Sequence, residues 1–179
     1  MLKWYRARID GACKEKSSDG YDLYDVTFID IGFSDKMTVQ RMRPLDASLT
    51  TVPAIAKECV LALLRVPALG AEYGDEAANA LQDWVHGVKL RIKSHGKDMA
   101  GRLQVSLWEE DGSCINAIMI ESGVARISST MAHRVLKRGG DEKDVELLRL
   151  CEAARETAKK ARARMYCYGD VGDSDDERR

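Results

Sequence analysis

Apolar and polar positions alternate in three short runs near the start of the chain. Residues 4–14 alternate and carry aromatic and branched side chains, and residues 21–31 are rich in types that favour sheets, so both stretches predict strands. Turn signals at 17–20 (SSDG) and 32–35 separate these strands from each other and from a shorter run at 37–40. The pattern predicts an antiparallel meander of three strands.

A second pattern begins near Ala54, after a linker that Pro44 and Pro53 bracket. The apolar run CVLALLRVPAL (59–69) predicts a buried strand ended by a proline. Residues 73–85 then place apolar side chains at helical spacing, with two acids in the first turn, where the helix dipole favours them. This region therefore predicts one buried strand followed by an amphipathic helix.

The remaining elements alternate between strands and helices. Residues 89–115 predict two strands joined by a turn, and a short helix is expected at 115–121. A brief strand is expected at 124–127, and one apolar stripe along 141–165 predicts a long helix. Residues 169–179 are acidic and glycine-rich, which predicts a disordered tail.

Composition narrows the function classes only slightly. The 179 residues are 45% hydrophobic, which is enough to bury a core. Because 28 Lys and Arg balance 29 Asp and Glu, net charge favours no partner, and a nucleic-acid surface would need local clustering. The opening MLKWYR lacks the apolar core of a signal peptide, and no apolar run is long enough for a membrane span.

The cysteines indicate a reducing environment. They form no CxxC pair and no Cys/His spacing typical of zinc, so we expect neither a structural metal nor a cofactor. Free thiols fit the cytoplasm, with the nucleus as a second compartment. The five cysteines are Cys13, Cys59, Cys114, Cys151 and Cys167.

The most specific stretches are short motifs in a fixed order. WYRAR (4–8), FIDIGF (28–33) and a strand ending RMRPL (41–45) together resemble a Tudor domain. YGDEA (73–77), GRLQVSL (101–107), INAIMIESGVARI (115–127) and the helix around EAARETAKKARARMY resemble the later part of a staphylococcal-nuclease-like fold. The order resembles the carboxyl end of the Tudor-SN family, over nearly the whole chain.

This resemblance implies a fold and a role. The fold class would be α+β, mainly β, with a Tudor (SH3-like) β-barrel at 1–50 joined to a partial nuclease-like OB barrel with helices at 51–168. The family acts as a scaffold in the RNA-induced silencing complex and other RNA-processing assemblies. We therefore expect a non-catalytic adapter module whose partners are proteins with dimethylated arginine–glycine segments and RNA or ribonucleoprotein complexes, with no membrane.

The family binds symmetrically dimethylated arginine in a cage of aromatic rings, and this chain matches the cage in part. Tyr5 and Phe28 match two cage aromatics, and Asp30 matches the motif's aspartate, which we expect to be a structural hydrogen-bond acceptor. Ile31 stands where a tyrosine belongs, and Phe33 stands where an asparagine belongs. The alternative to methylarginine binding is a Tudor scaffold that binds no ligand.

Three further expectations concern the same site. Phe33 would serve as a substitute wall of the cage. Trp4 would lie in the core, because alternation sends it to the face opposite Tyr5. The family's remaining cage aromatic lies upstream of Trp4, so we expect the sequence to be a fragment or a shortened gene model.

The nuclease chemistry implied by the second resemblance lacks its acids. A nuclease of this fold holds calcium and activates water with carboxylates from a D-T-P-E-type segment, and it clamps phosphate with two arginines. Here that segment is RVPAL, with Arg65 at the place of a metal-binding acid. Arg102 matches one clamping arginine but cannot bind a metal. We expect no nuclease activity.

A basic helix provides the alternative function, nucleic-acid binding. Arg155, Lys159 and Arg162 share one helical face by their spacing, and Lys160 lies beside them. A basic stripe can contact phosphates, and Arg102 would add a further contact. The opposing interpretation is a solvated helix end, where cations are favoured by the helix dipole.

Overall fold

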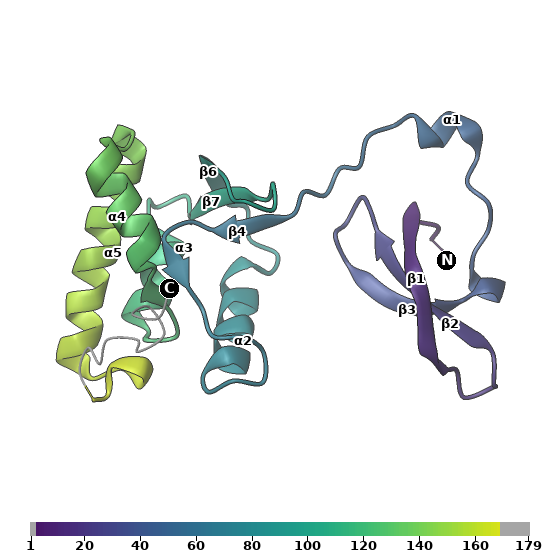
Figure 1. Ribbon diagram of the computed structural model, residues 1–179, viewed down its shortest axis with the longest axis horizontal. Helices are drawn as coiled ribbons and strands as arrows, with labels where there is room; N and C mark the ends of the chain where they lie inside the picture. The colour runs from purple at the N-terminus through teal and green to yellow at the C-terminus, as the bar shows by residue number, and fades with distance from the viewer. Residues whose placement is uncertain (1–2, 169–179) are drawn as a thin grey trace. The chain divides into compact units, whose positions relative to one another are not determined.

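The computed structural model describes residues 3–168 (Figure 1). Contacts divide the chain into two compact units, Met1–Glu58 and Cys59–Arg179. The expected tail at 169–179 lies outside the described residues.

The first unit is built on the predicted meander. Its three strands pair antiparallel in the order β1-β2-β3, with Ala7 opposite Phe28 and Tyr24 opposite Met37. After the sheet come a short 3-10 helix and a single helical turn. The elements are β1 (Ala7–Lys16), β2 (Asp22–Phe28), β3 (Ser34–Thr38), η1 (Val39–Arg41) and α1 (Ala47–Thr50).

The expectation that Trp4 lies in the core is wrong. Its side chain is 60% exposed, and the Arg43 guanidinium carbon lies 4.7 Å from the centre of the indole ring. The reason is local, because β1 begins only at Ala7, so strand alternation does not extend back to Trp4. Among residues 3–58, Val26 is the one buried hydrophobic residue, with 2% of its surface exposed.

The second unit contains a mixed sheet and a separate pair of strands. β4 runs parallel to β7, which pairs antiparallel with β6, and β5 pairs antiparallel with β8. The single strand expected over 59–69 is in fact β4 and β5, because Leu63 between them has a φ of 61° and breaks the extended backbone. The strands are β4 (Cys59–Leu61), β5 (Leu64–Arg65), β6 (Arg91–Lys97), β7 (Leu103–Trp108) and β8 (Arg126–Ile127).

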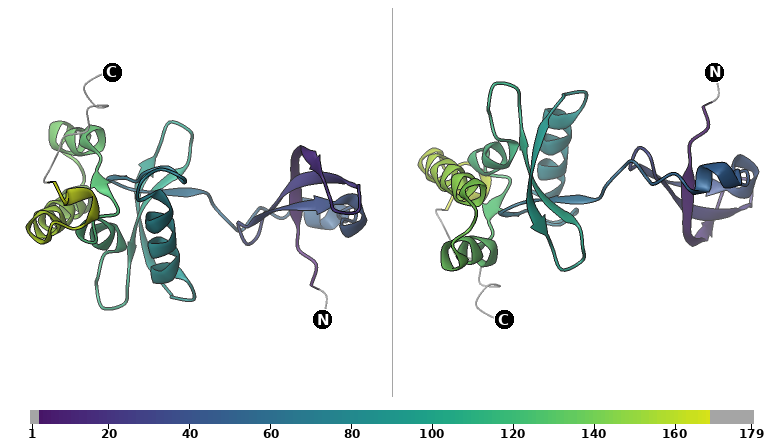
Figure 2. Two further views of the ribbon diagram at one scale, coloured as in Figure 1. Left: turned by 90° about the horizontal axis from the view of Figure 1, so that it is seen from below. Right: turned by 90° about the horizontal axis from the view of Figure 1, so that it is seen from above.

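The helices of the second unit lie on both sides of the β6–β7 pair, with α2 on one side and α4 and α5 on the other (Figure 2). The helix predicted at 115–121 is confirmed, whereas α4 was not predicted. The predicted helix at 141–165 ends earlier, because Arg162 has a φ of 49°. The helices are α2 (Gly74–Val85), α3 (Ile115–Glu121), α4 (Ser129–Arg138), α5 (Glu142–Ala161) and the 3-10 helix η2 (Arg164–Tyr166).

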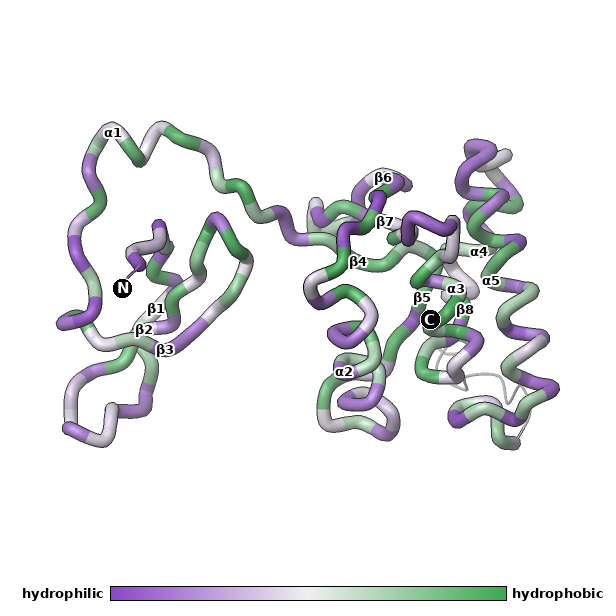
Figure 3. Tube along the Cα trace, turned by 180° about the vertical axis from the view of Figure 1, so that it is seen from behind, coloured by the Kyte–Doolittle hydropathy of each residue, from purple (hydrophilic) through white to green (hydrophobic). Residues whose placement is uncertain are grey.

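The core of the second unit centres on α3 and α5, and Figure 3 shows the apolar character of α3. Asn116 is a fully buried polar residue within this core. Its amide nitrogen donates to the carbonyls of Ala62, at 3.0 Å, and Val105, at 3.2 Å, and its oxygen accepts from the Leu107 amide at 3.1 Å. One side chain therefore joins α3 to two segments of the sheet region.

These observations confirm the α+β class. All five cysteines are free thiols. Within residues 3–168, no helix combines the length and apolar character that a membrane crossing requires.

Candidate functional site

Three aromatic rings of the first unit form one cluster, which we call the aromatic cluster: Tyr5, Phe28 and Phe33. The Tyr5 and Phe28 rings meet edge to face, with centroids 5.9 Å apart. The Phe28 and Phe33 rings lie 6.1 Å apart with an angle of 11° between their planes. Tyr5 is 49% exposed and Phe33 is 58% exposed, so ring surface is open to a ligand.

The backbone explains why Phe33 reaches Phe28. The amide of Phe28 donates to the Phe33 carbonyl at 2.8 Å, and the amide of Gly32 donates to the Phe28 carbonyl at 2.8 Å. Gly32 has a φ of 75°, which a residue without Cβ adopts readily. This closed turn brings the two phenylalanine rings together near Tyr5, which precedes β1.

Asp30 is engaged by Arg6. The Arg6 guanidinium donates to both carboxylate oxygens, at 2.8 Å from Nε and 2.5 Å from Nη2. These hydrogen bonds hold the pKa of Asp30 below its ordinary value. Arg6 also donates to three backbone carbonyls of the following segment, those of Leu49, Val52 and Pro53. Asp30 therefore orients an arginine that joins the residues just before β1 to the segment around α1.

Ile31 lies in the same turn and is 55% exposed. Its side chain excludes water but offers no π face to a cation. The cluster therefore presents three rings rather than a complete cage. Ring faces attract cations through their quadrupole, so this arrangement can hold a cationic side chain of low hydration.

A cavity of about 390 Å³ shares Tyr5 with the aromatic cluster. Trp4 and Ile9 line it from the start of the chain, and Arg43 reaches it from the segment after η1. The Arg43–Trp4 contact was not predicted from the sequence. The motif RMRPL shows an arginine there, but the sequence gives no indication of which ring it covers.

The residues matched to the nuclease chemistry do not assemble a metal site. Arg102 donates to Asp98 from its amide, at 2.8 Å, and from Nε, at 2.7 Å, across the turn between β6 and β7. Arg65 lies on β5, opposite Arg126 of β8. Within residues 3–168 no cluster of three or more His, Cys, Asp or Glu side chains could hold a metal ion.

The predicted basic stripe does not persist along one helical face. Arg155 and Lys159 lie on α5, where Lys159 Nζ is 3.2 Å from Glu156, and Arg155 Nε is 3.7 Å from the same carboxylate. Arg162 is the C-cap residue in the left-handed conformation, so helical spacing no longer places it above them. Lys160 is exposed.

Comparison with protein families matches both halves of the chain. The Tudor domain model matches residues 2–63, and the staphylococcal nuclease homologue model matches residues 55–165. The fold and the site thus define an extended Tudor domain, in which a Tudor domain built on a three-stranded sheet is followed by a nuclease-like domain. The chain belongs to the Tudor-SN family.

Individual relatives agree with this assignment. Ribonuclease TUDOR 1 of Arabidopsis thaliana is 27% identical over 97% of the chain, which spans 18% of the length of that relative. The extended Tudor domain of Drosophila melanogaster Tudor-SN has a TM-score of 0.72 at 21% identity, covering 92% of this chain and 69% of that one. The human TDRD1 extended Tudor domain, solved with a symmetrically dimethylated peptide, has a TM-score of 0.58 at 23% identity and covers 70% and 59%.

Proposed function

We propose that the chain is a non-catalytic adapter module that binds a methylated arginine of a protein partner through the aromatic cluster. The observation that carries this proposal is the gathering of Tyr5, Phe28 and Phe33 at one end of the sheet, with exposed ring surface. The partners are proteins with dimethylated arginine–glycine segments within ribonucleoprotein complexes. The TDRD1 structure solved with a dimethylated peptide supports this ligand class.

Methylation favours transfer of a guanidinium from water to aromatic surface. Methyl groups enlarge the cation and weaken its hydration, while the positive charge remains. A desolvated cation against ring faces gains about 2 kcal/mol, and an exposed one gains about 0.5–1 kcal/mol. Because Tyr5 and Phe33 are about half exposed, we expect the weaker end of this range for each ring.

Ile31 and Phe33 differ from the residues of the family motif, and these two differences determine how strongly the aromatic cluster binds a methylated arginine. Ile31 contributes no quadrupole, and Phe33 cannot accept or donate the hydrogen bond that an asparagine would make. Losing about 0.5–1 kcal/mol for a missing ring weakens binding several-fold, since 1.4 kcal/mol corresponds to a factor of ten. We therefore expect weak binding that depends on methylation.

Calorimetric titration tests the proposal. The chain is titrated with a dimethylarginine–glycine peptide and with its unmethylated counterpart, and binding is expected only for the methylated form. Tyr5→Ala should remove most of the heat, whereas Tyr21→Ala should not, because Tyr21 is a similarly exposed tyrosine outside the aromatic cluster. Equal binding of both peptides, or equal effects of the two substitutions, would refute the proposal.

The same proposal assigns no hydrolysis to this chain. Arg65 occupies the place of a metal-binding acid, and Arg102 is held by Asp98. Metal-assisted hydrolysis needs ligands that hold the cation and a group that activates water. Labelled single-stranded RNA incubated with the chain and calcium should remain intact. Cleavage that Arg102→Ala abolishes would overturn this part of the proposal.

A further inference from the structure

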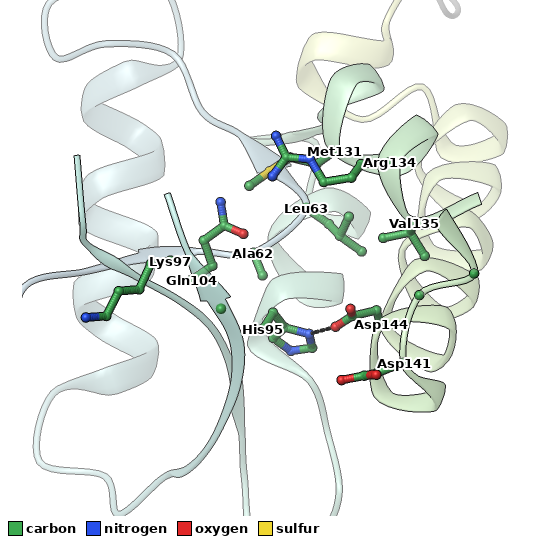
Figure 4. A pocket seen from close by; sticks show the side chains of 13 residues that line it. Ala62, Leu63, His95, Lys97, Gln104, Met131, Arg134, Val135, Asp141 and Asp144 are labelled. Atoms are coloured by element: carbon green, nitrogen blue, oxygen red, sulfur yellow. Dashed lines mark hydrogen bonds and ion pairs between the residues drawn. The ribbon is translucent and has the colours of Figure 1, made fainter. Parts of the chain in front are cut away.

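A second cavity, of about 320 Å³, lies within the second unit (Figure 4). Its size falls within the range of small-molecule sites in proteins. Apolar side chains of two segments, the one between β4 and β5 and α4, form part of its lining: Ala62, Leu63, Met131 and Val135. Polar side chains reach the cavity from β6, β7, α4 and the start of α5. They differ in how many hydrogen bonds and ion pairs they already make within the protein.

His95 is fully engaged and forms a fixed part of the lining. Its Nδ1 lies 2.5 Å from the Asp144 carboxylate, and its Nε2 lies 2.8 Å from the Ser106 hydroxyl, which also accepts from the Trp108 indole at 2.8 Å. The Ser–His–Asp order resembles that of hydrolases, but Ser106 has no exposed surface, so no substrate can reach its oxygen. This network holds the sheet against α5.

Gln104 is different, because its amide has no partner within residues 3–168 although the residue is only 8% exposed. The amide atoms are open to the cavity rather than sealed from solvent, so a ligand can replace water as their hydrogen-bond partner. Figure 4 shows the Gln104 amide directed toward the part of the cavity where Arg134 lies. Arg134 is exposed and forms no ion pair within the described residues.

The lining therefore has two ends of opposite character. Gln104 and Arg134 offer N–H donors, the arrangement that a carboxylate accepts best. At the other end lie the carboxylates of Asp141 and Asp144. Asp144 is held by His95, whereas Asp141 is 77% exposed at its side chain and has Lys143 Nζ 3.7 Å from its Oδ2. Lys97 also lines the cavity, but its side chain points away from Gln104 and Arg134 (Figure 4).

We propose that this cavity binds a small zwitterionic molecule. The carboxylate of the ligand accepts hydrogen bonds from Gln104 and Arg134, and its ammonium group pairs with Asp141. The carbon atoms between the two charges lie over Leu63 and Val135. This site is separate from the aromatic cluster and does not depend on it.

The test uses three probes that differ only at their ends. 6-Aminohexanoate carries both charges, hexanoate lacks the ammonium, and hexylamine lacks the carboxylate. We expect 6-aminohexanoate to shift the NMR signals of Gln104 and of the α4–α5 segment in the full chain, with each single-ended probe binding at least tenfold more weakly. Equal binding of hexanoate, or binding of inorganic phosphate in place of the zwitterion, would overturn the proposal.

Substitutions locate the two ends. Arg134→Met and Gln104→Leu should each weaken 6-aminohexanoate binding about tenfold, and Asp141→Asn should do the same while keeping a residue suited to the helix N-cap. Lys137→Met, an exposed change on the same helix outside the lining, should have no effect. If Gln104→Leu fails to fold, the variants Arg134→Met and Asp141→Asn, at exposed residues, decide the test. Binding unchanged in both variants would refute the site.

Discussion

The Phe28 and Phe33 rings lie nearly parallel, with centroids 6.1 Å apart, at the two ends of a single closed turn. The hydrogen bonds of that turn are between backbone groups, so they remain if the side chain at position 33 changes. The ring of Phe33 can therefore be exchanged without disturbing the position of Phe28. This separation makes the contribution of the ring to ligand binding measurable.

The first prediction concerns residues 31 and 33. Ile31→Tyr adds a ring to the turn and should strengthen binding of a dimethylarginine–glycine peptide several-fold, because each cation–π contact contributes about 0.5–1 kcal/mol. Phe33→Ala should weaken binding by a similar factor if the Phe33 ring contacts the cation. Calorimetry on the three proteins measures both effects.

Phe33→Asn separates two roles of that position. If a hydrogen-bonding amide is the better group, as the family motif implies, binding strengthens relative to Phe33→Ala. If only the ring matters, the asparagine and alanine variants bind equally weakly. Unchanged affinity in the alanine variant would contradict a role for the Phe33 ring.

A second prediction concerns acid stability of the first unit. Arg6 hydrogen bonds lower the pKa of Asp30, so the folded state favours the charged carboxylate more than the unfolded chain does. The resulting stabilisation is complete above the ordinary aspartate value of about 3.9 and is lost as the pH falls through the lower folded-state value. The melting temperature of the first unit, followed through NMR signals of β1 to β3, should fall over that range.

The comparison with Asp30→Asn isolates this contribution. Asp10 and Asp46 also have lowered pKa values, through hydrogen bonds led by Thr27 and Ser48 respectively, so part of the acid sensitivity remains in the variant. The variant should melt at a lower temperature at neutral pH and should differ less from the unaltered chain as the pH falls below about 3.9. A constant difference between the two proteins at all pH values would contradict the assignment.

The sequence predicted most of the elements because their signals are local. The meander follows from alternation and turn residues, and the helix at Ile115–Glu121 follows from its apolar spacing before Gly123. Sequence motifs identified Tyr5, Phe28 and Phe33 as candidate site residues. Their contacts depend on strand pairing, however, which brings Ala7 opposite Phe28 and cannot be measured from spacing alone.

What the sequence could not predict depends on distant contacts. Arg6 precedes β1 and Asp30 lies in the turn after β2, so the acceptor was recognisable from the motif but its donor was not. The helix α4 was missed although it carries local helix signals: Ser128 caps its start, Met131 and Val135 lie four residues apart on one face, and Gly139 ends it. Since α4 supplies part of the second cavity, that cavity was also missed.

The third prediction tests Asn116. Asn116→Leu keeps the volume of the side chain but leaves the Ala62 carbonyl and the Leu107 amide without the hydrogen bonds that Asn116 provides. Unsatisfied buried groups cost about 1–3 kcal/mol each, so the second unit should lose about 2–4 kcal/mol of unfolding free energy. Urea denaturation measures this loss, and Asn79→Leu, on the exposed side of α2, should change stability by less than about 0.5 kcal/mol.

The fourth prediction uses two glycines that both have a positive φ but differ in their surroundings. Gly112 has a φ of 95° and open space where a Cβ would lie, whereas Gly123 has a φ of 77° and a Cβ there would lie 2.4 Å from the Ala163 carbonyl oxygen. Both changes to alanine incur the strain of a positive φ, about 1–2 kcal/mol. Only Gly123→Ala adds a clash with backbone, which cannot rotate away as a side chain can.

Gly123→Ala should therefore destabilise the second unit by about 3 kcal/mol or more, against about 1–2 kcal/mol for Gly112→Ala. The clash pushes against the segment that joins α5 to η2, where the Met165 amide donates to the Gly123 carbonyl at 3.2 Å. Since Tyr166 in η2 is almost completely buried, displacement of this segment also disturbs the core. Urea denaturation gives the two losses, and amide exchange at η2 locates the damage. Equal losses in the two variants would show that the Ala163 segment yields without cost, contrary to the tight contact described here.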